Sequence, residues 1–212
     1  MSKNVEKGVD KFIVSCFIDT YDHIPASNNQ TFEEIVARFR VYESLIKRWN
    51  KRNNIVSRHD VENLWKKHFI PSIKPLETDL IPEKSVCLDA GSGGGFPGFP
   101  IAIFRNDIKL TMCDSNRKKT LFLRSSASKL ALSNVTVINR RIETIEEKYQ
   151  IVLSRGMGKP DVVVPLLADK IDDDGKIILW TNKDAAESFD GFRTKSYDIR
   201  DGGKLMVITP SN

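Results

Sequence analysis

The sequence predicts an α/β protein: a mostly parallel, seven-stranded sheet, covered on both faces and closed by a β-hairpin, with a small helical N-terminal extension. Three observations predict this fold. Up to about residue 80, apolar residues recur every three or four positions, as on one face of a helix. From Ser85 onward, short apolar runs alternate with helical patterns, as in parallel strands joined by right-handed crossovers. One of these runs ends in Asp89 and opens directly into a glycine-rich turn.

The composition fits one domain with an appendage. The chain has 212 residues, 40% hydrophobic and 29% charged, which is enough for a core and excludes intrinsic disorder. The net charge of +5 is compatible with a polyanionic partner but does not predict one. Three cysteines without a CxxC pair argue against zinc or disulfides and for a reducing compartment: Cys16, Cys87 and Cys113.

The sequence contains no uncharged apolar run long enough to span a bilayer. The apolar run at 12–18 is flanked by acidic residues, so we interpret it as part of the fold and not as a targeting segment. We therefore expect a cytoplasmic protein that binds neither a membrane nor a metal ion.

Two helices are predicted in the first 80 residues. Thr31 and Glu34 form a capping box, and the apolar pattern that follows predicts one amphipathic helix up to Trp49. A second helical stretch is expected over 60–70, ending at Pro71, because proline lacks the N–H that a helix interior requires. The first thirty residues give no clear pattern.

The later elements follow from the alternation of patterns. Strands are expected at Ser85–Asp89, Ile108–Asp114, Val135–Ile138, Tyr149–Ser154 and Lys176–Trp180. Helices are expected between them at Pro97–Phe104, Arg117–Leu132 and Pro160–Lys170. The closing hairpin is expected to consist of Arg193–Ile199, a turn through Asp201-Gly202-Gly203, and Leu205–Thr209.

The glycine-rich turn after the first strand is the most informative segment. From the strand end its pattern is D-x-G-x-G, formed by Asp89, Gly91 and Gly93. Such a turn lets a nucleoside lie against bare backbone at the carboxyl edge of the sheet. The turn also contains G-x-G-x-x-G, the pattern of dinucleotide sites, but that match begins four residues beyond the strand end.

Charge favours one ligand. A pyrophosphate needs amide N–H groups with no anion nearby, whereas the carboxylate of Asp89 beside the turn suits a cation. S-adenosylmethionine is cationic at its sulfur and amino group, so it is the expected cofactor. Asp114, at the end of the second strand, is placed to accept hydrogen bonds from ribose hydroxyls. The alternatives are a nicotinamide dinucleotide, or glycines that only form tight turns.

Several segments together resemble one family. They are WNKRNNI at 49–55, His68, LDAGSGGGFPGFP at 88–100, Asp114-Ser115 with Lys118-Lys119, Phe122-Leu123-Arg124, Arg141-Ile142-Glu143, and Ser154-Arg155-Gly156. Over roughly residues 31–183 the chain resembles the bacterial 16S ribosomal RNA guanine-N7 methyltransferases, also called glucose-inhibited division protein B. The GFPG-x-P extension of the turn is far more specific than D-x-G-x-G alone.

The resemblance implies a class I methyltransferase domain at 81–212, an RNA-contacting helical extension at 1–80, and S-adenosylmethionine as donor. The implied acceptor is the guanine at position 527, in the 530 loop of 16S ribosomal RNA, in free RNA or in a precursor of the small ribosomal subunit. With Asp89 and Gly93 of the turn, the implied cofactor positions are Gly91, Phe96, Asp114, Ser115, Ile142, Glu143 and Arg155. Three positions depart from the family pattern and leave the substrate-side geometry open: Pro71, Gly156 and Thr181.

Methylation at N7 agrees with what the sequence lacks. N7 carries a lone pair and no proton, so its reaction needs alignment and charge stabilisation but no general base. The sequence has no Asn-Pro-Pro-Tyr type motif for exocyclic amines, and Cys87 and Cys113 fall inside predicted strands. Arg155, just beyond the fourth strand, is the predicted catalytic residue, because its guanidinium suits the cofactor carboxylate or guanine O6. The alternative for Arg155 is an arginine on the surface without a catalytic role. The alternative for Glu143 is a carboxylate that only stabilises the start of a helix.

A basic window in the extension predicts RNA contact. Between Arg38 and Lys74, ten basic residues stand against three acidic ones, a local charge of +7. Trp49 and Trp65 lie in this window; we favour buried packing for both over base stacking, and a structural role for His68. The predicted RNA-binding residues are Lys47, Arg48, Lys51, Arg52, Lys118, Lys119 and Arg124.

Two other functions stay open from the sequence: methylation of a protein or small metabolite, and RNA binding without catalysis on a vestigial cofactor fold. The intact turn and Arg155 argue against the second. The oligomeric state is not predicted, although a monomer is favoured.

Overall fold

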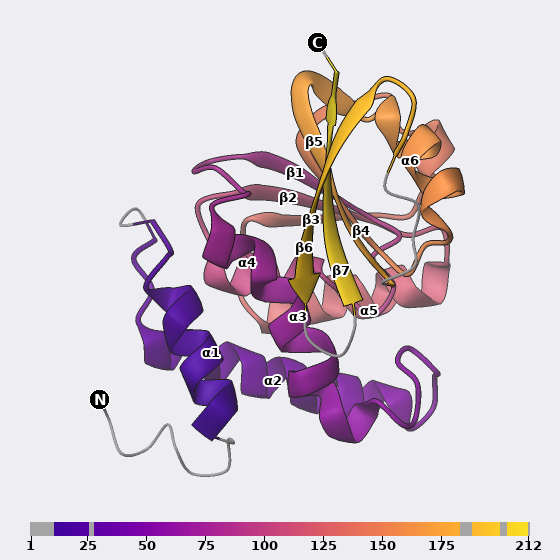
Figure 1. Ribbon diagram of the computed structural model, residues 1–212. Helices are drawn as coiled ribbons and strands as arrows, with labels where there is room; N and C mark the ends of the chain where they lie inside the picture. Colours follow the sequence, from indigo (N-terminus) through magenta and orange to yellow (C-terminus); the bar gives the residue numbers. More distant parts are fainter. Residues whose placement is uncertain (1–10, 26–27, 183–187, 200–202, 212) are drawn as a thin grey trace.

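The computed structural model describes residues 11–25, 28–182, 188–199 and 203–211 (Figure 1). Within them, seven strands form one sheet in the order β3-β2-β1-β4-β5-β7-β6. Strands β1 to β5 pair in parallel, and β7 is antiparallel to β5 and β6. The predicted fold class is therefore confirmed. The strands are β1 (Val86–Ala90), β2 (Lys109–Cys113), β3 (Val135–Ile138), β4 (Tyr149–Arg155), β5 (Ile171–Asn182), β6 (Phe192–Ile199) and β7 (Gly203–Pro210).

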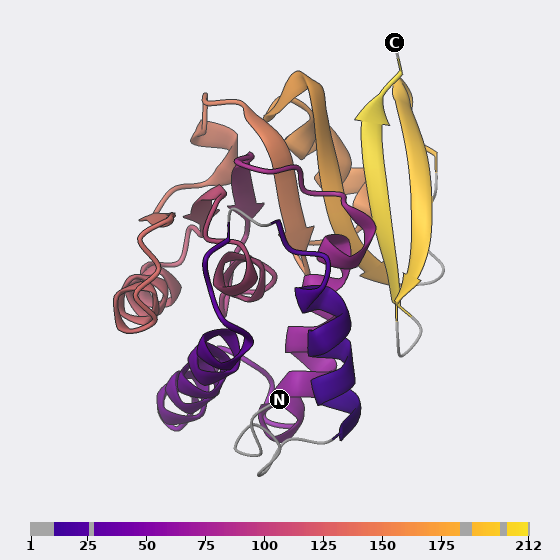
Figure 2. The ribbon, with the colours of Figure 1, turned by 90° about the vertical axis from the view of Figure 1, so that its left-hand side faces the viewer.

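Helices cover both faces of the sheet, and the β6–β7 hairpin stands at one edge (Figures 1 and 2). In β1, Cys87 packs with the helices of the extension and with α4 and α5, whereas Leu88 and Ala90 pack with α6. Side chains alternate along a strand, so Asp89 points to the same face as Cys87. The helices are α1 (Lys11–Tyr21), α2 (Phe32–Asn50), α3 (Ile70–Ile73), α4 (Gly98–Phe104), α5 (Arg117–Lys129) and α6 (Pro160–Ala168).

The strand predicted at 176–180 is longer in the structure. β5 begins at Ile171, which pairs with Tyr149; the polar residues after it bulge out of the ladder, and pairing with β4 resumes at Lys176. Apolar patterning missed this part because residues 172–174 are all aspartates. Of the predicted hairpin turn, residues 201 and 202 lie outside the described residues, and Gly203 begins β7.

The capped helix of the extension is α2, and its capping box is confirmed. The Thr31 hydroxyl accepts from the Glu34 N–H at 3.2 Å, and the Glu34 carboxylate accepts from the Thr31 N–H at 2.8 Å. Helix α1 was not predicted as a helix, although the run at 12–18 lies within it and so belongs to the fold.

The expectation that the second helical stretch ends at Pro71 is wrong. Helical turns continue through a 3₁₀ turn at Val61–Asn63, a π-helix at Trp65–Phe69, α3, and a further 3₁₀ turn at Lys74–Thr78. Pro71 is tolerated because it lies in the first turn of α3, where a missing N–H costs little. The wider π turn just before it, closed by the Ile70 N–H on the Trp65 carbonyl, carries the chain into α3.

The extension and the sheet share one core. Phe17, Phe39 and Phe69 of the extension cluster with Phe104 of α4, with ring centroids 5.1–5.6 Å apart for the pairs Phe17–Phe104, Phe39–Phe104 and Phe39–Phe69. All four side chains are fully or almost fully buried. This cluster joins residues from both sides of position 80. The expected domain boundary at residue 80 therefore stays a prediction.

Among the described residues, no helix has both the length and the apolar composition needed to cross a bilayer. The three cysteines are free thiols.

Candidate active site at the carboxyl edge of the sheet

The glycine-rich turn is held by a small set of hydrogen bonds. The Ser92 N–H donates to the Cys113 carbonyl at 2.9 Å, and the Ser92 hydroxyl donates to the Asp89 carbonyl at 2.8 Å. The Gly93 N–H donates to the Asp114 carboxylate at 2.9 Å. Gly91 and Gly93 have φ values of +69° and +55°, where other residues are strained. The turn is thus fixed against the ends of β1 and β2.

A cavity of about 390 Å³ opens beside this turn. The size lies within the range of small-molecule sites. Five predicted cofactor positions line it together: Gly91, Asp114, Ser115, Ile142 and Glu143. Its other walls are formed by Cys113, Lys119, Arg140, Arg141, Gly156, Met157 and Leu166.

Asp114 is the polar anchor of the cavity. Its carboxylate accepts from the backbone N–H groups of Gly93 and Asn116, at 2.9 and 2.8 Å, and lies 3.7 Å from the Lys119 ammonium. These contacts orient a buried carboxylate that still borders the cavity. A ribose hydroxyl is a donor that such a carboxylate can accept.

Sequence reasoning missed Met157. At Gly91 an added Cβ would stand 3.0 Å from the Met157 Cγ, so this side chain covers the bare backbone of the turn. Gly156, with φ of +69° and open space around it, turns the chain so that Met157 reaches that position. The only available signal was Gly156 itself, which the sequence marked as a departure from the family pattern.

Asp89 does not border the cavity. Its side chain is fully buried on the α4 face, where Gly98 and Met112 are its neighbours. Burial raises the pKa of Asp89 to about 7. The Ser92 hydroxyl and the Gly98 N–H are near enough to oppose this shift, but neither oxygen has a hydrogen-bond partner among the described residues. Contact between Asp89 and the donor stays a prediction.

Phe96 also points away from the cavity, into the extension. Its ring lies 4.7 Å from that of His68 and 5.5 Å from that of Tyr42. The Tyr42 hydroxyl donates to the Gly94 carbonyl at 2.6 Å. The extension thus supports the glycine-rich turn from behind.

Arg155 faces the extension as well. Its Nη2 donates to the Lys67 carbonyl at 2.7 Å, and its Nη1 contacts the His68 carbonyl and the Ser72 hydroxyl, both at 3.3 Å. Burial lowers the pKa of Arg155 to about 10, so it stays protonated at neutral pH. The structure does not bring Arg155 together with the five cavity residues, and direct contact with cofactor or base stays a prediction.

His68 is neutral at pH 7. Burial and the nearby Arg155 lower its pKa to about 4, although Asp60, 3.4 Å away, opposes the shift. Because its ring packs on Phe96, the structural role favoured for His68 agrees with its position.

The predicted RNA-binding residues lie on α2, in the turn directly after it, and on the adjacent α5. Trp49, near the end of α2, packs on Phe122 of α5 with ring centroids 5.3 Å apart, so the two basic groups are neighbours. Trp65 packs against the core and donates to Glu43 at 2.9 Å; both tryptophans are half-buried, which agrees with packing more than with free stacking platforms.

The seven cations are not equivalent. Lys47 is ion-paired with Glu43 at 2.9 Å, and Arg124 donates to the Val137 carbonyl at 3.3 Å. Lys119 borders the cavity. The remaining predicted cations are exposed: Arg48, Lys51, Arg52 and Lys118.

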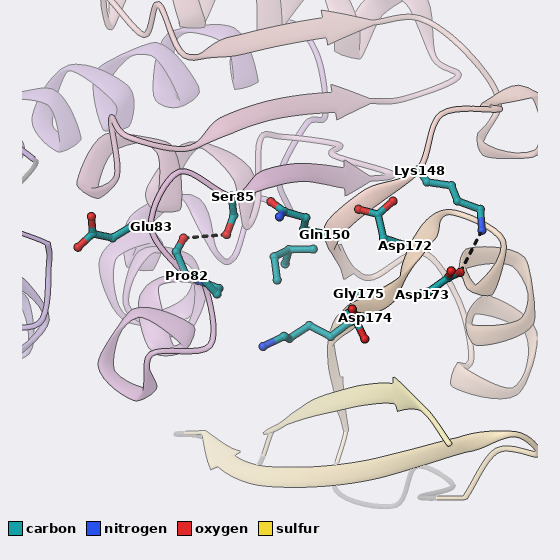
Figure 3. Close-up of a pocket in the computed structure, with 11 residues that line it drawn as sticks. Pro82, Glu83, Ser85, Lys148, Gln150, Asp172, Asp173, Asp174 and Gly175 are labelled. Carbon is teal, nitrogen blue, oxygen red and sulfur yellow. Dashed lines mark hydrogen bonds and ion pairs between the residues drawn. The ribbon is translucent and has the colours of Figure 1, made fainter. Parts of the chain in front are cut away.

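A larger cavity, of about 590 Å³, lies at the opposite edge of the sheet (Figure 3). It is lined by Pro82, Gln150 and three consecutive aspartates at 172–174, and Lys148 pairs with Asp173 across 4.0 Å. Ligands of open α/β sheets bind at the carboxyl ends of strands, and this cavity lies at the amino ends. No group of three metal-ligating side chains occurs among the described residues.

Comparison with known proteins decides the family. The model of the family described as rRNA small subunit methyltransferase G matches residues 35–199. The chain belongs to this family. It is 32% identical over 183 residues to the Ribosomal RNA small subunit methyltransferase G of Clostridium perfringens (strain SM101 / Type A), covering 84% of this chain and 76% of that protein. It is 35% identical over 193 residues to that of Clostridium beijerinckii, covering 86% and 78%.

Solved structures support the fold of this methyltransferase. A ribosomal protein L11 methylase from Lactobacillus delbrueckii subsp. bulgaricus superposes with a TM-score of 0.58 at 10% identity, over 69% of this chain and 79% of that chain. A putative methyltransferase, yhhF, from Escherichia coli gives 0.54 at 14% identity, over 67% and 84%. At these identities the likeness shows the class I fold alone.

Family membership makes the chain an rRNA methyltransferase, with S-adenosylmethionine as its methyl donor. The residues of the cavity fit this donor. Asp114 offers an oriented acceptor, Ile142 offers an apolar wall, and Gly91 lines the cavity beside the flexible Met157 side chain.

Proposed function

We propose that this methyltransferase methylates N7 of the guanine at position 527, in the 530 loop of 16S ribosomal RNA. The observation that carries the proposal is the cavity at the carboxyl edge, which gathers five expected cofactor positions and has Lys119 of the basic α5 in its wall. Donor and RNA can therefore meet at one place. Family membership supports the rRNA substrate.

Five residues would hold the donor. Asp114 would accept hydrogen bonds from the ribose hydroxyls, with Ser115 beside it, and Ile142 and Glu143 would hold the adenine side. Gly91 would face the rest of the donor. The glycine-rich turn would be held in shape by three residues that do not line the cavity: Asp89, Gly93 and Phe96.

The reaction asks little of the protein beyond alignment. Bound S-adenosylmethionine supplies an electrophilic methyl group: its carbon–sulfur bond breaks as the N7 lone pair forms the new bond. N7 loses no proton, so no side chain has to act as a base. Burial raises the pKa of Cys113 to about 11 and that of Cys87 to about 12. Neither thiol ionises at pH 7, which disfavours covalent attack on a pyrimidine.

The extension, residues 1–80, would dock the RNA together with α5. Exposed cations at the end of α2 and the start of α5 suit phosphate groups, and the contact of Trp49 with Phe122 joins the two helices. Lys47 and Arg124 contribute less, because each already has a partner in the protein.

The test is transfer of labelled methyl from S-adenosylmethionine to deproteinised 16S RNA, to precursor particles and to intact small subunits. The label should map to position 527 by borohydride reduction and aniline cleavage, which detects N7-methylguanine. Label on another atom would refute the N7 assignment. Label on a protein or a small metabolite would favour the alternative substrates, and binding without transfer would favour a non-catalytic RNA-binding protein.

A further inference from the structure

We propose that Arg155 and Trp180 form a clamp that fixes the extension against the carboxyl ends of β4 and β5, so that docked RNA meets the donor in one orientation. Arg155 is then a positioning residue. The effect of the clamp on methyl transfer rests on the proposed function. The existence of the clamp does not depend on that function.

The two residues act from adjacent strand ends. Arg155 ends β4 and is the register partner of Trp180 on β5. The Trp180 indole N–H donates to the Pro71 carbonyl at 2.7 Å, and Arg155 donates to the Lys67 carbonyl at 2.7 Å. Strand ends 25 residues apart in sequence therefore hold the same short stretch of the extension.

The segment at 67–72 is built to accept these donors. Arg155 donates to the Lys67 carbonyl, one turn before Pro71, which itself has no N–H to donate. The Ser72 hydroxyl donates to the His68 carbonyl at 2.6 Å and lies 3.3 Å from Arg155, so the carbonyls are held in place. The π-helix before α3 is a local departure of a kind that is frequent at functional sites.

The clamp is also joined to the cavity. Gly156 and Met157 follow Arg155 directly in the chain, line the cavity, and bring the Met157 side chain against Gly91. A shift of the segment at 67–72 would be passed through Arg155 to the cavity wall. A general stabilising contact elsewhere in the fold would have no such route.

The tests are the variants Arg155→Lys and Trp180→Phe, with Arg105→Lys as the matched control. Arg105 is also a buried arginine that holds backbone carbonyls, those of Ile81 and Pro82, but it lies at the opposite edge of the sheet. Its variant should lower stability without changing methyl transfer by folded molecules. Trp180→Phe keeps most of the apolar surface and removes only the donor, so it remains informative if the arginine variant folds poorly.

Hydrogen exchange should rise about tenfold or more at amides 65–73 in both clamp variants, because their opening is no longer opposed by these bonds. The single-turnover rate on RNA should fall about tenfold or more, while the affinities for S-adenosylmethionine and for RNA stay within about twofold. Arg105→Lys should change neither the local exchange at 65–73 nor the rate.

Three results would overturn the clamp. A large loss of S-adenosylmethionine affinity with unchanged exchange would make Arg155 a cofactor ligand. A slower reaction with unchanged exchange would place Arg155 on the base. Unchanged exchange and rate would make both contacts incidental. If the wild-type protein does not methylate RNA, the proposed function fails, but the exchange measurement still decides whether the clamp exists.

Discussion

Replacing Gly91 with alanine places a methyl group against Met157 at the wall of the donor cavity. Two costs follow. The φ of +69° costs a residue with a Cβ about 1–2 kcal/mol in the folded state. The new Cβ also stands 3.0 Å from the Met157 Cγ, tighter than an ordinary contact, so the flexible methionine must move, and the cavity is beside it.

Gly93→Ala separates these two costs. Gly93 has a similar φ of +55°, but a Cβ there meets only the Gly91 carbonyl, at an ordinary 3.7 Å. Urea unfolding should show both variants destabilised by about 1–2 kcal/mol. Calorimetry should show about a tenfold loss of S-adenosylmethionine affinity for Gly91→Ala alone, close to 1.4 kcal/mol. Adding Met157→Ala to Gly91→Ala should restore affinity but not stability.

An equal loss of affinity in Gly93→Ala and Gly91→Ala would refute this assignment of the cavity wall. Of these two glycines, only Gly91 lines the cavity, so the donor should be sensitive to bulk there and not at Gly93.

Three further predictions concern the carboxylates and the basic surface. Asp114→Asn should weaken S-adenosylmethionine binding about tenfold or more by calorimetry, since a charged acceptor is lost from the ribose; an unchanged affinity would remove Asp114 from the site. Burial raises the folded-state pKa of Asp89 to about 7, so its contribution to stability is complete below pH 4 and is lost as pH rises to 7. Relative to the wild type, Asp89→Asn should therefore raise the melting temperature more at pH 8 than at pH 4. Its affinity for S-adenosylmethionine should stay within about threefold of the wild-type value; a large affinity loss would show that the carboxylate reaches the donor. The double reversal Lys51→Glu with Arg52→Glu should flatten the salt dependence of RNA binding in a filter assay, whereas reversal of two exposed cations on β6, at 193 and 195, should not; equal slopes would place RNA docking elsewhere.

The sheet could be predicted well from the sequence because its buried strands are short runs of apolar residues. The strand at 135–138 has the predicted bounds, and the capping box of Thr31 and Glu34 begins α2 where expected. The bulged start of β5 was missed because aspartates at 172–174 carry no apolar pattern, and tertiary pairing with β4 brings them into the strand.

Side-chain direction at the site was harder to predict. The motif placed Asp89 and Arg155 at the correct edge of the sheet, but strand alternation turns both to the face covered by the extension. The clamp depends on carbonyls of the segment at 67–72 that the Arg155 and Trp180 side chains reach, and on a π-helix that no local pattern predicts. Residues distant in sequence therefore decided what Arg155 contacts.

The shared aromatic cluster has a consequence for how the chain can be divided. Phe17 and Phe39 cover Phe104, and Tyr42 packs edge-on to Phe99 at 5.2 Å, so the inner surface of α4 is completed by residues from before position 80. A fragment beginning at residue 81 would expose that apolar surface to water and should aggregate. The extension and the sheet are therefore parts of a single cooperative unit, which would melt in one transition and could not be exchanged as separate modules between proteins.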